Sequence, residues 1–180
     1  MAVGAYSTDF QIVPGVRLGG IPCGLKGIDQ LDLVLFEFVP GSVTAGMFTQ
    51  SHFAAAPVLV GREHLDQGHS RYFLINSGNA NAATGQQGID DAEAMCAAVA
   101  SELGIDANEV LVCSTGLIGI PMPIDVIKAG IPSVVAARSA EGGHAAATAI
   151  MTTDTVAKQV VIDGGGFVVG GMAKGAAMLS

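Results

Sequence analysis

The sequence predicts a mixed α/β domain in which helices pack against sheets that contain antiparallel strand pairs. Short apolar runs with the length of strands alternate with segments of helical periodicity, as expected for a layered α/β fold. Consecutive strand-like runs lie early in the chain, and a glycine-rich hairpin lies near its end. We find no GxGxxG in a suitable context and no P-loop lysine motif, so a doubly wound nucleotide-binding sheet is not favoured.

The strands are predicted from short apolar runs bounded by turn residues. Residues 31–38 have the leucine, valine and phenylalanine content of a buried strand. Residues 43–48 are expected to form a second strand, joined to the first through the turn residues Pro40 and Gly41. The remaining predicted strands are 57–60, 72–75, 110–113, 159–162 and 167–169, of which the last two form the hairpin.

The clearest helix is predicted over residues 91–103, where apolar residues recur every four positions on one face. Asp90 is the expected N-cap, and Glu93 is placed as in a capping box. Gly104 is the expected C-terminal stop. Shorter helices are predicted at 123–129, 133–140 and 144–151.

The composition indicates a subunit with large interfaces. Half of the 180 residues are hydrophobic, only 13% are charged, and the mean hydropathy is +0.52. Soluble domains typically carry about 25% charged residues. A membrane protein is not indicated, because proline, glycine and polar residues interrupt the longest uncharged stretch, 38–61. The first ten residues lack a basic residue and a long apolar core, so we expect no targeting peptide and a cytoplasmic location.

The charge pattern disfavours a nucleic-acid partner. The formal net charge is −8, and the eight basic residues are scattered rather than gathered into a basic face. Cys23, Cys96 and Cys113 lie far apart without a CxxC motif, and the four histidines show no ligand spacing. Neither a metal site nor a disulfide framework is therefore expected.

Residues 114–116 leave a predicted strand with the sequence Ser-Thr-Gly. The hydroxyl of Thr115 and the backbone N–H of Gly116 could donate hydrogen bonds to a carbonyl oxygen as it gains negative charge, which is the chemistry of an oxyanion hole. Glycine also lets a ligand approach the backbone closely. The same three residues are, however, also typical of a turn between a strand and a loop.

Three further polar segments allow two interpretations each. Residues 152–155 place hydroxyls and a carboxylate after an apolar helix, where they could bind a ligand or satisfy the helix end. Lys174 stands alone in a glycine-rich stretch and could bind a carboxylate or lie on a surface loop. The asparagines could orient polar groups or make turns, and they are Asn76, Asn79 and Asn81.

Six motifs occur in order along the chain: AGMFT at 45–49, AAPV at 55–58, NSGNANA at 76–82, STGLIG at 114–119, AIMTTDT at 149–155 and GMAKG at 171–175. Together they resemble the ornithine acetyltransferase family, and the resemblance extends from about residue 14 to residue 180. It implies a self-processing fold of the N-terminal-nucleophile type, similar to the aminopeptidase/ornithine acetyltransferase fold.

The resemblance also implies a partner chain. Members of the family cut their own precursor at an Ala–Thr bond, and the new N-terminal threonine begins the β-chain. Residues 1–180 would then form a single α-chain domain that ends a few residues before the cut, after Met178-Leu179-Ser180. An α2β2 heterotetramer is expected.

The activity implied by the resemblance is glutamate N-acetyltransferase, a step of arginine biosynthesis. The β-chain threonine would take the acetyl group from N-acetylornithine and pass it to glutamate in a ping-pong mechanism. Thr115 and Gly116 match the family's oxyanion hole, and Thr152 and Lys174 match its substrate-binding positions, with Lys174 suited to the substrate's α-carboxylate. No cofactor is implied, although acetyl-CoA could serve as a co-substrate.

Two other functions are weighed against this one. An aminopeptidase of related fold would use an N-terminal serine, and the MTTDT and MAKG motifs argue against it. A non-catalytic subunit or scaffold would not need Thr115, Gly116 and Lys174, which are all present.

Overall fold

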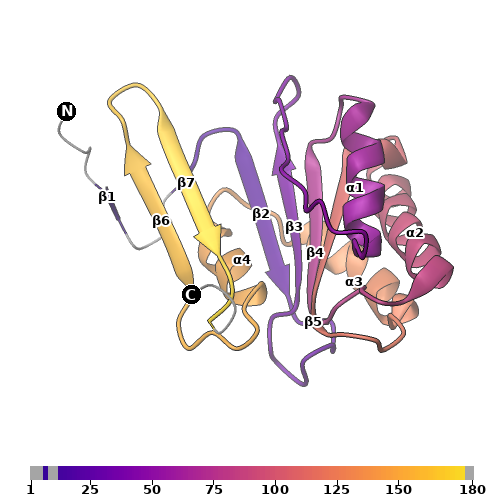
Figure 1. Ribbon diagram of the computed structural model, residues 1–180. Helices are drawn as coiled ribbons and strands as arrows, with labels where there is room; N and C mark the ends of the chain where they lie inside the picture. The colour runs from indigo at the N-terminus through magenta and orange to yellow at the C-terminus, as the bar shows by residue number, and fades with distance from the viewer. Residues whose placement is uncertain (1–5, 8–11, 177–180) are drawn as a thin grey trace.

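A four-stranded mixed sheet forms the centre of the molecule (Figure 1). The computed structural model describes residues 6–7 and 12–176. The strand order is β2-β3-β4-β5, with antiparallel pairing of β2–β3 and β3–β4 and parallel pairing of β4–β5. The strands are β2 (Val16–Ile21), β3 (Leu33–Phe38), β4 (Tyr72–Asn79) and β5 (Val110–Leu117).

A second sheet lies beside β2 and contains the predicted hairpin (Figure 1). Its strands are β1 (Tyr6–Ser7), β6 (Lys158–Asp163) and β7 (Val168–Ala173), in the order β1-β6-β7. The hairpin turn is closed by a hydrogen bond from the Gly164 N–H to the Phe167 carbonyl, 2.9 Å long. The hairpin prediction is confirmed, and β7 runs further than expected, to the residue before Lys174.

Helices cover both faces of the central sheet because side chains alternate between faces along each strand. Leu33 and Leu35 pack with three helices on one face, whereas Val34 packs with α4 on the other. The helices are α1 (Ala56–Asp66), α2 (Gly85–Leu103), α3 (Ile124–Ala136) and α4 (Gly143–Ala149), with a 3-10 turn, η1, at Ala107–Glu109. The mixed α/β fold class is therefore confirmed. No helix in the described residues has the length and apolar character needed to cross a membrane.

The predicted strand at 43–48 is wrong. Residues 42–51 have no regular structure, and Val43 and Met47 are 94% and 102% exposed. The physical reason is that β2 and β4 already occupy both edges of β3, so this segment cannot form a hairpin with the strand that precedes it. The strand predicted at 57–60 is also wrong: it belongs to α1, where Pro57 fits the first turn because that position needs no N–H partner.

Strand β2 was not predicted, because Gly19 and Gly20 interrupt its apolar pattern. Both glycines allow helices to approach the sheet closely. A Cβ atom on Gly19 would lie 2.7 Å from the Val134 carbonyl oxygen of α3, and one on Gly20 would lie 2.7 Å from the Ala145 carbonyl oxygen of α4. The glycines are thus a packing requirement rather than a break in the strand.

The helix boundaries also differ from the prediction. Helix α2 begins at Gly85 with Thr84 at its N-cap position, so the expected N-cap at Asp90 is wrong; the Asp90 carboxylate instead accepts a hydrogen bond from Gln86. Gly104 is confirmed as the helix end, with a left-handed φ of 67°. Helix α3 continues through Pro132, so it combines the helix predicted at 123–129 with the start of 133–140.

Replacing Gly20 with alanine should destabilise the full-length protein by about 1–3 kcal/mol, because the added methyl group must displace the α4 backbone. Urea unfolding of the variant measures this change. Gly166→Ala is the matched control, since nothing lies within 4 Å of its added Cβ. Equal stability of the two variants would contradict the proposed close approach of α4 to β2.

Candidate active site

One cavity of about 600 Å³ is lined by all four residues predicted to act on substrate, namely Thr115, Gly116, Thr152 and Lys174. These residues come from β5, from the loop after α4 and from the segment directly after β7. The structure therefore brings together segments that lie up to 59 residues apart along the chain. The rest of the lining consists of Leu25, Lys26, Gln30, Gly78, Leu117, Thr153, Gly175 and Ala176.

The parallel pair β4–β5 forms one wall of this cavity. Gly78 is the register partner of Gly116, and Ser77 is the partner of Thr115. Gly116 has a φ of +138°, and a Cβ on it would lie 2.3 Å from the Gly78 carbonyl carbon. Only glycine fits between the two strands at this point, and the backbone beside Thr115 consequently faces the cavity without a covering side chain.

The side chains of Thr115 and Lys174 meet inside the cavity. Lys174 Nζ donates a hydrogen bond to Thr115 Oγ1 over 2.5 Å. Both residues are half-buried. The predicted oxyanion donor and the predicted substrate-binding lysine are therefore in direct contact, which the linear sequence did not indicate.

Asp154 connects the two segments that carry Thr152 and Lys174. Its fully buried side chain accepts hydrogen bonds from the Thr152 N–H (3.1 Å), from the Gly175 N–H (2.7 Å) and from Lys158 Nζ. Burial alone would raise the pKa of the Asp154 carboxyl, but these hydrogen bonds and the Lys158 charge lower it to about 2, from an ordinary value of 3.8. The carboxylate is thus ionised and holds the two segments together.

A second buried carboxylate, Asp32, shapes the part of the wall that contains Leu25 and Lys26. It accepts four backbone N–H bonds, from residues 23–26, with lengths between 2.6 and 3.1 Å. Lys26, at the end of this turn, donates to the Leu31 and Ala149 carbonyl oxygens, each over 3.0 Å. Burial lowers the pKa of its ammonium group, although the charges of Asp32 and Asp154 oppose this.

Sequence reasoning missed Asp32 and Lys26. Ser77, also missed, donates to the same Ala149 carbonyl oxygen over 2.5 Å, so two side chains hold the end of α4 against the cavity. A signal for Asp32 was present: an acidic residue directly precedes the apolar run 33–36, where an unpaired charge would be costly. No local pattern distinguished Lys26.

The asparagines and histidines lie outside the cavity lining. The Asn76 amide donates to the Asn79 carbonyl oxygen (2.8 Å), and the Asn81 amide donates to the Gly88 carbonyl oxygen (2.7 Å). The first contact holds the end of β4 and the second joins the loop after β4 to α2, so both amides hold backbone, as the turn-making interpretation expects. His64 contacts the Val110 carbonyl oxygen and His144 contacts Gln159.

The three cysteines are free thiols. Burial is the main cause that raises the pKa of Cys23 and of Cys96 to about 12, so neither thiol ionises near neutral pH. In the described part of the chain, no three His, Cys, Asp or Glu side chains are grouped so that they could hold a metal ion.

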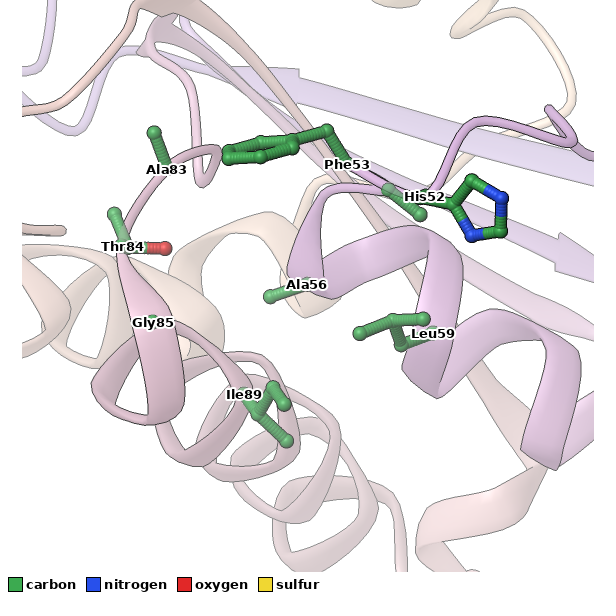
Figure 2. A pocket seen from close by; sticks show the side chains of 9 residues that line it. His52, Phe53, Ala56, Leu59, Ala83, Thr84, Gly85 and Ile89 are labelled. Carbon is green, nitrogen blue, oxygen red and sulfur yellow. The ribbon is translucent and has the colours of Figure 1, made fainter.

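A smaller hollow of about 240 Å³ lies between the first turns of α1 and α2 and contains none of the predicted site residues. Figure 2 shows the Phe53 ring extending toward Ala83, whereas the His52 ring points away from the other side chains. Its lining is mainly apolar, and we assign it no chemical role.

A model of the ArgJ family matches residues 17–180, which is almost the whole chain. The chain belongs to the ArgJ family. The ornithine acetyltransferase resemblance is thereby confirmed. A curated relative, "Arginine biosynthesis bifunctional protein ArgJ" of Methylococcus capsulatus, is 47% identical over 178 residues, which cover 96% of this chain and 43% of the relative. This ArgJ chain therefore spans less than half the length of that relative.

Two solved structures of the ArgJ family have the same fold. Ornithine acetyltransferase of Mycobacterium tuberculosis, complexed with ornithine, has a TM-score of 0.93 and 42% identity, and the match covers 98% of this chain and 97% of that chain. The bifunctional ArgJ protein of Bacillus halodurans has a TM-score of 0.84 and 35% identity, with coverages of 98% and 95%. The architecture described above is thus shared with these two proteins.

Replacing Asp154 with asparagine should destabilise the protein clearly near neutral pH and progressively less in acid. Because the folded-state pKa is lowered, the carboxylate contributes stability above its unfolded value of 3.8, and this contribution disappears as the pH falls through about 2.

Urea unfolding of the full-length wild type and variant, from about pH 7 down to about pH 3, measures the difference. Asp66→Asn, at an exposed carboxylate in α1, is the control and should show a small effect throughout. A destabilisation by Asp154→Asn that stays constant over this range would contradict the ionised-anchor interpretation.

Proposed function

We propose that this chain forms one part of a glutamate N-acetyltransferase that moves the acetyl group of N-acetylornithine to glutamate. The observation that carries the proposal is the single cavity that combines the Thr115 hydroxyl, the Gly116 backbone, Thr152 and Lys174. Its chemistry suits a substrate with an amide carbonyl to polarise and a carboxylate to bind. An ArgJ-family structure that is similar over nearly the whole chain contains ornithine, the product of the first half-reaction.

The attacking group in this proposal belongs to a second chain made from the same precursor. This chain covers 43% of a curated relative's length but 97% of a solved chain, which supports division of the family's precursor into separate chains. Large apolar side chains are also nearly fully exposed here, including Ile28, Val43 and Phe53 at 91%, 94% and 89%. A second chain that covers them would reduce an exposed apolar surface that is otherwise unfavourable. An α2β2 assembly follows as the proposed oligomer.

The proposed reaction has two half-reactions. The β-chain threonine hydroxyl attacks the acetyl carbonyl, and the threonine's own α-amine, with an ordinary pKa of about 7.7–8.0, accepts the hydroxyl proton. The carbonyl oxygen becomes an oxyanion that accepts hydrogen bonds from the Thr115 hydroxyl and the Gly116 N–H. The C–N bond then breaks, the protonated amine returns its proton, and ornithine leaves as the free amine.

The second half-reaction reverses this chemistry with a different amine. The glutamate amine attacks the acetyl-threonine ester, and the same two donors stabilise the new oxyanion. The ester bond breaks and the threonine hydroxyl regains a proton, so no cofactor is consumed. The word "bifunctional" in the relative's name supports a second activity, for which we propose acetyl transfer from acetyl-CoA. Family membership favours this acyltransferase over the related aminopeptidase and over a scaffold.

Thr115→Ala should lower kcat for acetyl transfer by about 10²–10³-fold, because one oxyanion donor is lost. Self-cleavage should slow as well, since it passes through a similar oxyanion. Steady-state kinetics and gel analysis of freshly made precursor measure the two effects. Thr155→Ala, at an exposed hydroxyl outside the cavity lining, serves as the control; an unchanged kcat in Thr115→Ala would remove Thr115 from the oxyanion hole.

Mass spectrometry of the purified full-length product should reveal two chains, the second beginning with threonine. Incubation with acetylornithine followed by acid quenching should add one acetyl group to that N-terminal residue. A single uncut chain with full activity would rule out the self-processing part of the proposal.

A further inference from the structure

We infer that Lys174 is a positioning residue for the oxyanion hole: its ammonium group fixes the Thr115 hydroxyl so that the hydroxyl hydrogen points into the cavity. This inference rests on the proposed function and extends it. If Lys174 only bound a substrate carboxylate, it would act in substrate recognition alone. Its contact with Thr115 gives it a role in the chemical step.

The direction of the hydrogen bond decides the orientation of the hydroxyl. Lys174 Nζ lies 2.5 Å from Thr115 Oγ1. An ammonium group has three donors and no acceptor, so Oγ1 must be the acceptor in this contact. The hydrogen of the Thr115 hydroxyl therefore points away from the lysine and remains available to another acceptor.

Both partners of this contact are held by separate parts of the fold. Thr115 is placed by the parallel pairing of β5 with β4 in the central sheet. On the other side, the Gly175 N–H donates to Asp154 (2.7 Å), and the Gly175 carbonyl oxygen accepts from Lys158 Nζ (2.9 Å). The backbone that follows Lys174 is thus held at both its polar groups, and the ammonium group reaches Thr115 from the second sheet.

The electrostatic effect should favour the transition state over the bound substrate. A hydroxyl that accepts a charge-assisted hydrogen bond is polarised and becomes a stronger donor itself. This gain is larger toward a full oxyanion than toward a neutral carbonyl oxygen, and only interactions that strengthen in the transition state raise kcat. Lys174 should therefore affect kcat through Thr115, in addition to any effect on KM through a carboxylate.

Lys26 provides an internal contrast. It lines the same cavity, but its ammonium group donates to two backbone carbonyl oxygens, those of Leu31 and Ala149. Those contacts hold the cavity wall and do not involve Thr115. Both lysines place a positive charge at the cavity. Lys174 differs from Lys26 because it contacts the Thr115 hydroxyl.

The test uses the processed full-length enzyme and two acetyl donors, N-acetylornithine and p-nitrophenyl acetate. The second donor has a carbonyl to polarise but no carboxylate to bind. We expect Lys174→Met to lower kcat about tenfold or more with both donors, as the removal of a transition-state interaction does. A fall limited to acetylornithine, or a rise in KM without a change in kcat, would overturn the inference.

A double-mutant cycle supplies the second criterion. In a Thr115→Ala background the further loss on adding Lys174→Met should be at most a few-fold, because the lysine acts through the hydroxyl that is already absent. If the fold-reductions in kcat of the two single variants multiply in the double variant, the two side chains act independently and this coupling is contradicted. Lys174→Arg, which also donates without accepting, should restore part of the activity.

Controls separate this inference from the proposed function. Lys128→Met, at an exposed position in α3, should leave both activities unchanged. If the wild-type enzyme hydrolyses p-nitrophenyl acetate but does not transfer acetyl from acetylornithine, the proposed substrate is refuted. The effect of Lys174→Met on ester hydrolysis would still decide the role of Lys174. If Lys174→Met does not fold, Lys174→Gln gives the same comparison without the charge.

Discussion

The buried carboxylate of Asp154 is the interaction on which the site geometry depends. A buried charge is unfavourable unless its hydrogen-bonding capacity is satisfied. Here two backbone N–H groups and the Lys158 ammonium group satisfy it, and they belong to the loop after α4, to β6 and to the segment after β7. The buried charge is stable only when these groups surround it. It therefore favours one relative position of the segments that carry Thr152 and Lys174.

The same principle recurs in the part of the cavity wall that contains Leu25 and Lys26. The carboxylate of Asp32 is buried and accepts four backbone N–H bonds from the turn at 23–26. That turn presents Lys26, which together with Ser77 holds the end of α4. Two buried acids therefore hold the backbone around the cavity in place. The cavity lining includes lysine and threonine side chains, although the chain as a whole has a net charge of −8. In the proposed mechanism, it is the local preorganisation of donors, rather than the overall charge, that stabilises the developing oxyanion.

Local patterns predicted features whose requirements lie within one short stretch of sequence. The hairpin of β6 and β7 was predicted because its turn and both strands are contiguous. The end of α2 at Gly104 was predicted because a left-handed glycine is a local requirement. The segment at 43–48 has equally strand-like residues but fails to form a strand, since β2 and β4 already pair with β3. Whether an apolar run becomes a strand depends on a free sheet edge, and no local pattern contains that information.

The sequence by itself determined the α/β class, the family and the candidate residues Thr115, Gly116, Thr152 and Lys174. Apolar periodicity and ordered motifs are properties of the chain alone. Only the tertiary structure decided that Lys174 contacts Thr115 across 59 residues, and that Gly116 must be glycine because the Gly78 backbone lies against it. Both are contacts between elements placed by sheet pairing and by the Asp154 anchor. Such contacts depend on how the whole chain packs, so residue types and spacing could name the participants but not their arrangement.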